Sequence, residues 1–298
     1  MWLFYALMAP FFFSITHILD SFCVEDIFER PWMGMVTSAM ASIIVFIPLP
    51  YIIPFLNWES PTWQIIGLAL IAGALIQGSH YLYFQSLSFS EAGIVAAYWN
   101  LIPVFVPILS FLIFRDILNI TQYIGITILI VASTYMLLID HNSRAGKTAF
   151  LLMVLASFLQ ACAYILLDYV YKFIPFFQGY IIMLISLILV GITPLLFPSI
   201  QSIFKQSFSR LKKASKIIIT IEGFYLLALA SAQKAISIGD PALVAAVETT
   251  IPAFTLIISV LLLGHIRTAK YGDPKSEHHL QIKLTLISAM CIGVWFVS

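Results

Sequence analysis

Ten long apolar stretches constrain this chain more than any other feature of its sequence. A helix needs roughly 20 mostly apolar residues to cross the hydrocarbon core of a bilayer. The stretches that approach this length are Trp2–Phe22, Trp32–Ile53, Trp63–Tyr83, Ala92–Phe114, Ile120–Leu138, Thr148–Tyr171, Phe176–Phe197, Lys216–Ile236, Pro241–Leu263 and Ile282–Val297. Most connections are short, and the two longer ones, Pro198–Ser215 and Gly264–Gln281, are polar and basic. The sequence therefore predicts an all-α integral membrane protein with ten transmembrane helices.

The composition excludes the soluble classes of protein. Of the 298 residues, 61% are hydrophobic and only 10% are charged, whereas a soluble domain has roughly 25% charged residues. The net charge of +1 gives no field that would attract a polyanion, so we expect no nucleic-acid partner. Cys23, Cys162 and Cys291 lie far apart, which indicates neither a disulfide framework nor a metal site. We expect no cofactor, and we expect a multi-pass protein of the cell membrane, in a bacterium the inner membrane.

The second half of the sequence repeats features of the first half. A shift of 149 residues (237 minus 88) superposes two hairpins with their following helices, and a shift of 148 (168 minus 20) superposes two acids. Chance alignment of apolar helices is the alternative, since Ala, Val and Leu match easily. The aligned pairs are Ser88–Ala97 with Ser237–Ala246, Pro103 with Pro252, and Asp20 with Asp168.

These matches predict two homologous five-helix halves, residues 1–142 and 143–298. Because five is an odd number, the second half must enter the membrane from the opposite side, as in the inverted repeats of secondary transporters. The distribution of basic residues predicts the orientation. The loops that follow odd-numbered helices, with their flanks, contain all but three of the 15 Lys and Arg residues. The opposite side of the membrane has only Arg115, Lys172 and Lys234. The positive-inside rule then places both termini outside the cytoplasm.

In this pattern the chain resembles the EamA-like branch of the drug/metabolite transporter (DMT) superfamily. The resemblance is carried by the ten-helix arrangement and by two segments, Ser90-Glu-Ala-Gly-Ile-Val-Ala-Ala-Tyr-Trp-Asn-Leu-Ile-Pro-Val-Phe-Val-Pro107 and Gly239-Asp-Pro-Ala-Leu-Val-Ala-Ala-Val-Glu-Thr-Thr-Ile-Pro252. It implies that these segments form the fourth helix of each half and that a small molecule is carried between the halves. The family often closes this helix with a Gly-Glu pair, where this chain has Arg115-Asp116 and Gly264-His265. Many members also keep their termini in the cytoplasm, against the charge count.

Glu248 is the leading candidate for a functional side chain. It lies seven residues after Pro241, which is roughly 10 Å along a helix. A charge at such depth costs about 2.5–3.5 kcal/mol on insertion scales, so an intramembrane acid is a functional hypothesis by default. No Lys or Arg lies within one turn of it. The predicted role is proton coupling or cation binding, and the alternative is a protonated Glu in a helix interface.

Glu222 is the second candidate acid. It lies six residues into the helix predicted for Lys216–Ile236, and Tyr225, Leu229 and Gln233 follow at helical spacing, which would form a stripe towards a cavity. The alternative is a side chain that extends to the headgroups beside the basic loop.

Two further acids lie near the ends of the first and sixth predicted helices. His17 precedes Asp20 by three residues and shares its face, an arrangement that suits a proton relay. Asp168 has Tyr164 four residues before it and Tyr171 three residues after it. Simple solvation of acids at helix ends is the alternative for both.

Aromatic residues on the third and fourth helices are candidates to contact an organic cation, because an aromatic face attracts cations. Trp99 aligns with Glu248 in the repeat and lies too deep for an interfacial belt, and Tyr98 precedes it. The alternative for the tyrosines is that interfacial belt. The third helix places on one stripe the residues Gln77, His80, Tyr81 and Phe84.

Pro103 and Pro252 lie in the middle of their predicted helices, where a proline removes a backbone hydrogen bond and kinks the helix. Paired kinks are candidate hinges for alternating access, or else static bends.

The sequence thus predicts a secondary active transporter for a small polar, cationic or zwitterionic metabolite, of the amine or amino acid class, coupled to protons. Buried acids outnumber buried bases, which disfavours sugar nucleotides. An aspartyl protease would need a Gly-x-Gly-Asp setting, and Ile238-Gly239-Asp240 lacks the first glycine. A channel or a membrane scaffold without transport activity stays open as the alternative.

Overall fold

The computed structural model describes residues 1–28, 30, 32–52, 54, 58–90, 92–138, 146–263 and 277–298, and for residues 20–26, 52, 92–93, 259–263 and 277–280 it describes the backbone alone. The protein is 87% helical, and the described residues contain no strand. Nine helical segments in the described part are long and apolar enough to cross a membrane, and Gln281–Val297 is a shorter apolar helix. The predicted all-α membrane fold of about ten helices is confirmed.

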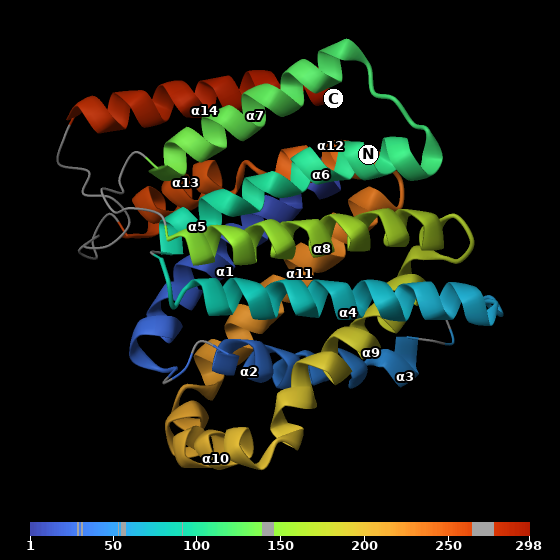
Figure 1. Ribbon diagram of the computed structural model, residues 1–298, viewed down its shortest axis with the longest axis vertical. Coiled ribbons are helices and arrows are strands. Elements are labelled where there is room, and N and C mark those ends of the chain that lie inside the picture. Colours follow the sequence, from blue (N-terminus) through green and yellow to red (C-terminus); the bar gives the residue numbers. More distant parts are fainter. Residues whose placement is uncertain are drawn as a thin grey trace.

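The first half of the chain contains α1 to α7 and the second half α8 to α14 (Figure 1). In the first half the helices are α1 (Trp2–Asp26), α2 (Trp32–Ser42), η1 (Ile43–Phe46), α3 (Leu49–Ile52), α4 (Trp63–Ser86), α5 (Ala92–Tyr98), η3 (Trp99–Leu101), α6 (Ile102–Phe114) and α7 (Ile120–Leu138). In the second half they are α8 (Lys147–Tyr171), α9 (Phe176–Ile192), η4 (Thr193–Leu196), α10 (Pro198–Lys213), α11 (Ser215–Ile236), α12 (Pro241–Glu248), α13 (Ile251–Leu263) and α14 (Glu277–Val297).

The packing of the two halves follows one exchanged pattern. The first membrane-spanning segment of each half packs on the third membrane-spanning segment of the other half, so that α1 contacts α11 and α8 contacts α4. Likewise α1 contacts α13 and α8 contacts α6, while α7 and α14 pack side by side (Figure 1). Two halves related by a two-fold axis produce such an exchange. The predicted boundary between residues 142 and 143 lies outside the described residues.

The fourth helix of each half is broken, not merely kinked, which corrects the prediction that Pro103 and Pro252 lie in mid-helix. In the first half a 3-10 turn separates α5 from α6, and in the second half Thr249 and Thr250 separate α12 from α13. Pro103 and Pro252 are each the second residue of the helix after the break. A proline is tolerated in the first turn because its missing N–H would have no helical partner there.

Helix α10 corrects a second expectation, that Pro198–Ser215 is only a polar connection. It is a 16-residue helix with Arg210, Lys212 and Lys213 in its last turn, where cations complement the helix dipole. In Figure 1 it lies at the lower edge of the molecule, beside α2 and below the main bundle.

Close packing of helices depends on small residues in the membrane. At Gly73 in α4, a Cβ atom would overlap the carbonyl oxygen of Met183 and would lie 3.0 Å from the Cβ of Ser186, both on α9. Glycine therefore sets how closely α4 and α9 approach.

Candidate functional site

Glu248 lies inside the bundle at the end of α12, next to the helix break. All eight residues of α12 are buried, and Glu248 is 9% exposed. Its Oε2 accepts a hydrogen bond of 2.7 Å from the hydroxyl of Tyr164 on α8, and its Oε1 has no hydrogen-bond partner among the described residues. A buried polar atom without a partner is uncommon in native proteins and calls for an explanation. One oxygen of the carboxylate is thus fixed by Tyr164, and the other can accept a further hydrogen bond.

A line of polar side chains leads along α8 to this carboxylate. Gln160, Tyr164, Asp168 and Tyr171 are spaced by four, four and three residues, so they share one face of the helix. Gln160 interacts with the Tyr164 hydroxyl and accepts a 2.7 Å hydrogen bond from Ser79 of α4. The network therefore connects α4, α8 and α12.

Glu222 is buried as well, although its position near the start of α11 also allowed a place at the headgroups. Its exposed fraction is 2%. The hydroxyl of Ser38 donates to Oε2 at 2.5 Å, and the hydroxyl of Ser42 donates to Oε1. Both serines belong to α2, so this carboxylate ties α2 of the first half to α11 of the second half.

Two histidines lie in the same interior as the two acids. The ring of His80 on α4 meets the ring of Tyr225 on α11 edge-on, with 5.5 Å between centroids. His17 on α1 lies close enough to His80 for their charges to interact, and Tyr225 is similarly close to Tyr164. Tyr225 follows Glu222 by three residues and lies near Tyr164, the partner of Glu248, so the residue that His80 contacts is close to both environments. The side chain of Asp20, the predicted relay partner of His17, lies outside the described residues.

Tyr81 does not belong to the buried network, and its predicted contact with a substrate stays a prediction. Its side chain is 44% exposed. The buried face of α4 passes through Ala69, Ala72 and Ile76. Five residues beyond Ile76, at roughly 100° per residue, Tyr81 points about 140° away from that face. His80 and Tyr81 are neighbours on the predicted stripe of α4, but helix packing places only His80 against Tyr225.

Trp99 and Tyr98 lie at the break between α5 and α6. The Trp99 ring packs on Tyr83 at 5.5 Å and Tyr98 packs on Phe150 at 5.2 Å. Among the described residues, neither side chain makes a hydrogen bond or a ring contact with Glu248 or its partner Tyr164. Instead the polar residue buried at this break is Asn100, whose amide donates 3.0 Å hydrogen bonds to Ser133 and Thr134 of α7.

Asp168 lies at one end of the α8 line, at a pocket of about 320 Å³ that Asp116, Asp240 and Lys172 also line. It accepts a 2.8 Å hydrogen bond from Lys172, as an ion pair. Burial raises the pKa of Asp240, and the neighbouring Asp168 and Asp116 raise it further. The α8 line therefore begins at an acidic pocket and ends at the buried network.

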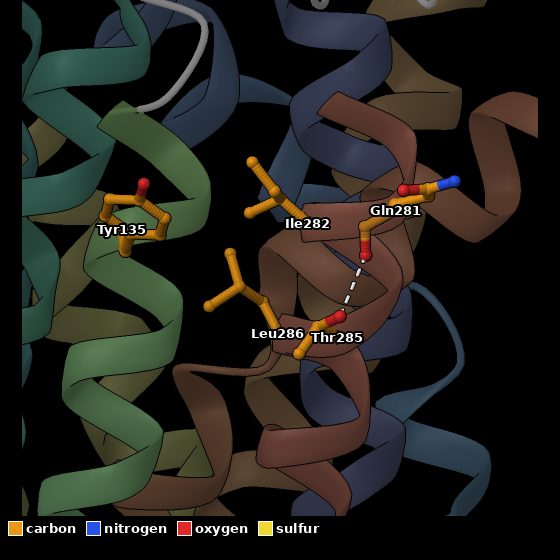
Figure 2. Close-up of a pocket in the computed structure, with 5 residues that line it drawn as sticks. All are labelled: Tyr135, Gln281, Ile282, Thr285 and Leu286. Carbon is orange, nitrogen blue, oxygen red and sulfur yellow. Dashed lines mark hydrogen bonds between the residues drawn. The ribbon is translucent and has the colours of Figure 1, made fainter. Parts of the chain in front are cut away.

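A second pocket, of about 420 Å³, lies between α7 and α14 and contains none of the predicted site residues (Figure 2). Its polar side chains are Tyr135, Gln281 and Thr285, and the Thr285 hydroxyl donates a 2.9 Å hydrogen bond to the backbone carbonyl of Gln281. Across the described ranges, no group of three or more His, Cys, Asp and Glu side chains is arranged to hold a metal ion. The candidate site is therefore the Glu248 network and its neighbours.

The comparison with known families decides the classification. Residues 1–139 match the sequence model of the EamA-like transporter family, which is part of the DMT superfamily. The match covers somewhat less than half of the 298-residue chain, so residues 1–139 are similar to this family. The resemblance seen in the sequence is confirmed, and the family indicates a membrane transporter of the DMT type.

The fold comparison covers nearly the whole length of the chain. Of the solved structures, 28 chains match. One crystal structure has a TM-score of 0.69 at 12% identity, with 99% of this chain and 97% of that chain covered. At this identity the likeness shows a shared fold alone, and it includes both halves of the chain. No curated protein matches the chain.

Several residues of the buried polar network were not singled out from the sequence. These are the hydrogen-bond partners Ser38, Ser42, Ser79, Gln160 and Asn100. Single serines and amides are common in apolar helices, so their type carried no signal. The one available signal was the α8 spacing of Gln160 to Asp168.

Proposed function

We propose that this EamA-like protein is a secondary active transporter that exchanges a small cationic or zwitterionic metabolite, of the amine or amino acid class, for protons. One observation carries the proposal: the Oε1 atom of Glu248 is buried and has no hydrogen-bond partner in the described part of the chain. That oxygen can hold an exchangeable proton, or it can accept a hydrogen bond from an ammonium N–H. Because one carboxylate serves both, proton and cation compete, and such competition couples their movements in opposite directions.

The surroundings of Glu248 support a cation over an anion. The α8 line starts at three aspartates around the surface pocket and continues through the tyrosine hydroxyls of Tyr171 and Tyr164. A field of this sign concentrates cations at the entrance. The only described base at that pocket is Lys172, and its ammonium is paired with Asp168. The pairing leaves the aspartates Asp116 and Asp240 in excess, so the pocket has net negative charge.

Alternating access is the mechanism that we propose for the movement itself. The two helix breaks lie in corresponding places, between α5 and α6 and between α12 and α13. Broken helices near the midplane mark the substrate site in many inverted-repeat transporters. With Pro103 and Pro252 fixing the first turns of α6 and α13, the breaks preceding them are the hinge candidates.

Transport in proteoliposomes tests the proposal. Purified protein would be assayed at pH 6 and pH 8 with amino acids, polyamines, quaternary amines and a sugar nucleotide. We expect proton-dependent flux of an amine or an amino acid, loss of that flux in Glu248→Gln, and partial loss in Tyr164→Phe. The matched control is Glu59→Gln, because it makes the same change on an exposed connection.

Three outcomes would contradict the proposal. Flux of the sugar nucleotide alone would overturn the substrate class. Wild-type flux in Glu248→Gln would show that Glu248 is structural. Flux that follows the concentration gradient at every pH, without any proton movement, would indicate a channel or uniporter.

A further inference from the structure

Among the helices that the structure describes, α10 differs from the others in its position and its charge. It connects two membrane-spanning segments, Phe176–Leu196 and Ser215–Ile236, so both of its ends lie at a membrane surface. Its inner side, formed by Phe204, Ser207 and Leu211, is buried against Met35 and Val36 of α2. The helix is therefore fixed to the bundle along one side and open along the other.

The open side carries only positive charge. Between residues 198 and 221 there is no Asp or Glu. Lys205, Lys212 and Lys213 are exposed, and Arg210 and Lys216 are exposed next to them. Cations in the last turn suit the helix dipole, but Lys205 lies in the middle of the helix, where the dipole does not explain it.

Apolar groups accompany these cations at the surface. Leu196 is 78% exposed, Phe197 is 61% exposed and Phe208 is 52% exposed. A helix that combines exposed Lys and Arg with exposed aromatic and aliphatic side chains is typical of segments that lie in the plane of the interface. The apolar groups have a place in the acyl region, and the cations then lie at the level of the headgroups.

We propose that the outer side of α10 binds the headgroups of anionic phospholipids. Charge complementarity selects this occupant, because the described outer side has no acid to pair with its lysines while anionic headgroups lie at the same level. The binding site is independent of the transported substrate. Because α10 packs on α2 one turn before Ser38, bound lipid also holds the helix whose serines donate to Glu222.

Native mass spectrometry of the full chain from mixed micelles tests this proposal, with phosphatidylglycerol and phosphatidylcholine as competing probes. We expect the wild-type protein to retain phosphatidylglycerol in preference, and to lose the preference in about 1 M salt, where the screening length falls to about 3 Å. The combined variant K205Q/K212Q/K213Q should lose at least about tenfold of the preference, since each lysine contributes to attraction at the surface. The matched control K205R/K212R/K213R keeps the charge and should behave as wild type.

The single variants Lys205→Gln, Lys212→Gln and Lys213→Gln guard against misfolding of the triple variant, and each should lose part of the preference. Equal retention of both lipids by the wild-type protein would overturn the proposal. So would a wild-type preference in the glutamine variants, because the anionic lipid would then bind elsewhere. Displacement of phosphatidylglycerol by an acidic peptide at equal charge concentration would assign the surface to a protein partner instead.

Discussion

The contact between α4 and α9 gives the most direct test of the packing, through two glycines on one helix. At Gly73 an added Cβ would overlap the backbone oxygen of Met183 and would lie 3.1 Å from the backbone nitrogen of Leu187. At Gly67, two turns earlier, an added Cβ would meet no atom within 4 Å. Replacement of each glycine by alanine therefore makes the same chemical change in opposite environments.

The expected energies have opposite signs. Overpacking of a tight contact costs about 1–3 kcal/mol, and the upper end applies at Gly73 because the atoms in the way belong to the backbone of α9. Alanine gains up to about 1 kcal/mol over glycine in a helix at either position. The net change in the free energy of unfolding is then about −2 kcal/mol for Gly73→Ala and up to about +1 kcal/mol for Gly67→Ala.

Thermal unfolding in detergent, followed by tryptophan fluorescence, measures the difference. At about 2–4 °C per kcal/mol for a chain of this order of size, the two variants should differ in apparent Tm by about 6–12 °C, with Gly73→Ala the less stable. If both variants melted together, or if Gly67→Ala were the less stable, the close approach of α4 and α9 would be wrong.

Three further predictions concern single side chains. Glu222→Ala should lower the free energy of unfolding by about 1–2 kcal/mol, because two buried serine hydroxyls on α2 lose their acceptor, and Glu222→Gln should lower it less; equal melting of both variants would contradict the bridge. Asp240→Asn should raise Tm at pH 7 but not at pH 4. The raised pKa of Asp240 means that its charged form destabilises the folded state, a penalty that is absent below the unfolded pKa and complete above the folded pKa. A gain in Tm that did not depend on pH would refute this. Arg115→Gly should raise the free energy of unfolding by up to about 1 kcal/mol, since Arg115 ends α6 with φ 63°, where glycine is not strained, and a lower Tm would refute this.

The Arg115 position also links the family pattern to its physical basis. The family often has glycine where this chain has Arg115, and the structure places that residue in the left-handed conformation that glycine adopts freely. In this chain α6 still ends at that position, where the side chain of Arg115 makes the left-handed conformation strained.

That the chain forms about ten apolar, membrane-spanning helical segments followed from the sequence alone. A bilayer leaves the backbone no partner but itself, so apolar stretches of sufficient length must be helical, and their count needs no knowledge of packing. The sequence placed Glu248 away from the ends of its apolar stretch, and the structure buries it at the end of α12, next to the break. The prolines marked where the fourth helices are interrupted, although not that the helices end there. The polar and basic composition of Pro198–Ser215 predicted a connection, whereas the segment forms α10. A helix at the membrane interface needs only one buried side, and three residues supply it here: Phe204, Ser207 and Leu211.

The tertiary structure decided which side chains face the interior and which partners they find. Nothing near Glu222 in the sequence indicated the hydroxyls of Ser38 and Ser42, which lie more than 170 residues away and reach it only because α2 packs on α11. Likewise a stripe on α4 contains both His80 and Tyr81, and only the neighbouring helices determine that the first is turned inwards and the second outwards. Helix formation in a membrane depends on local composition, whereas a site between helices depends on contacts between distant segments, and these form only when the bundle packs.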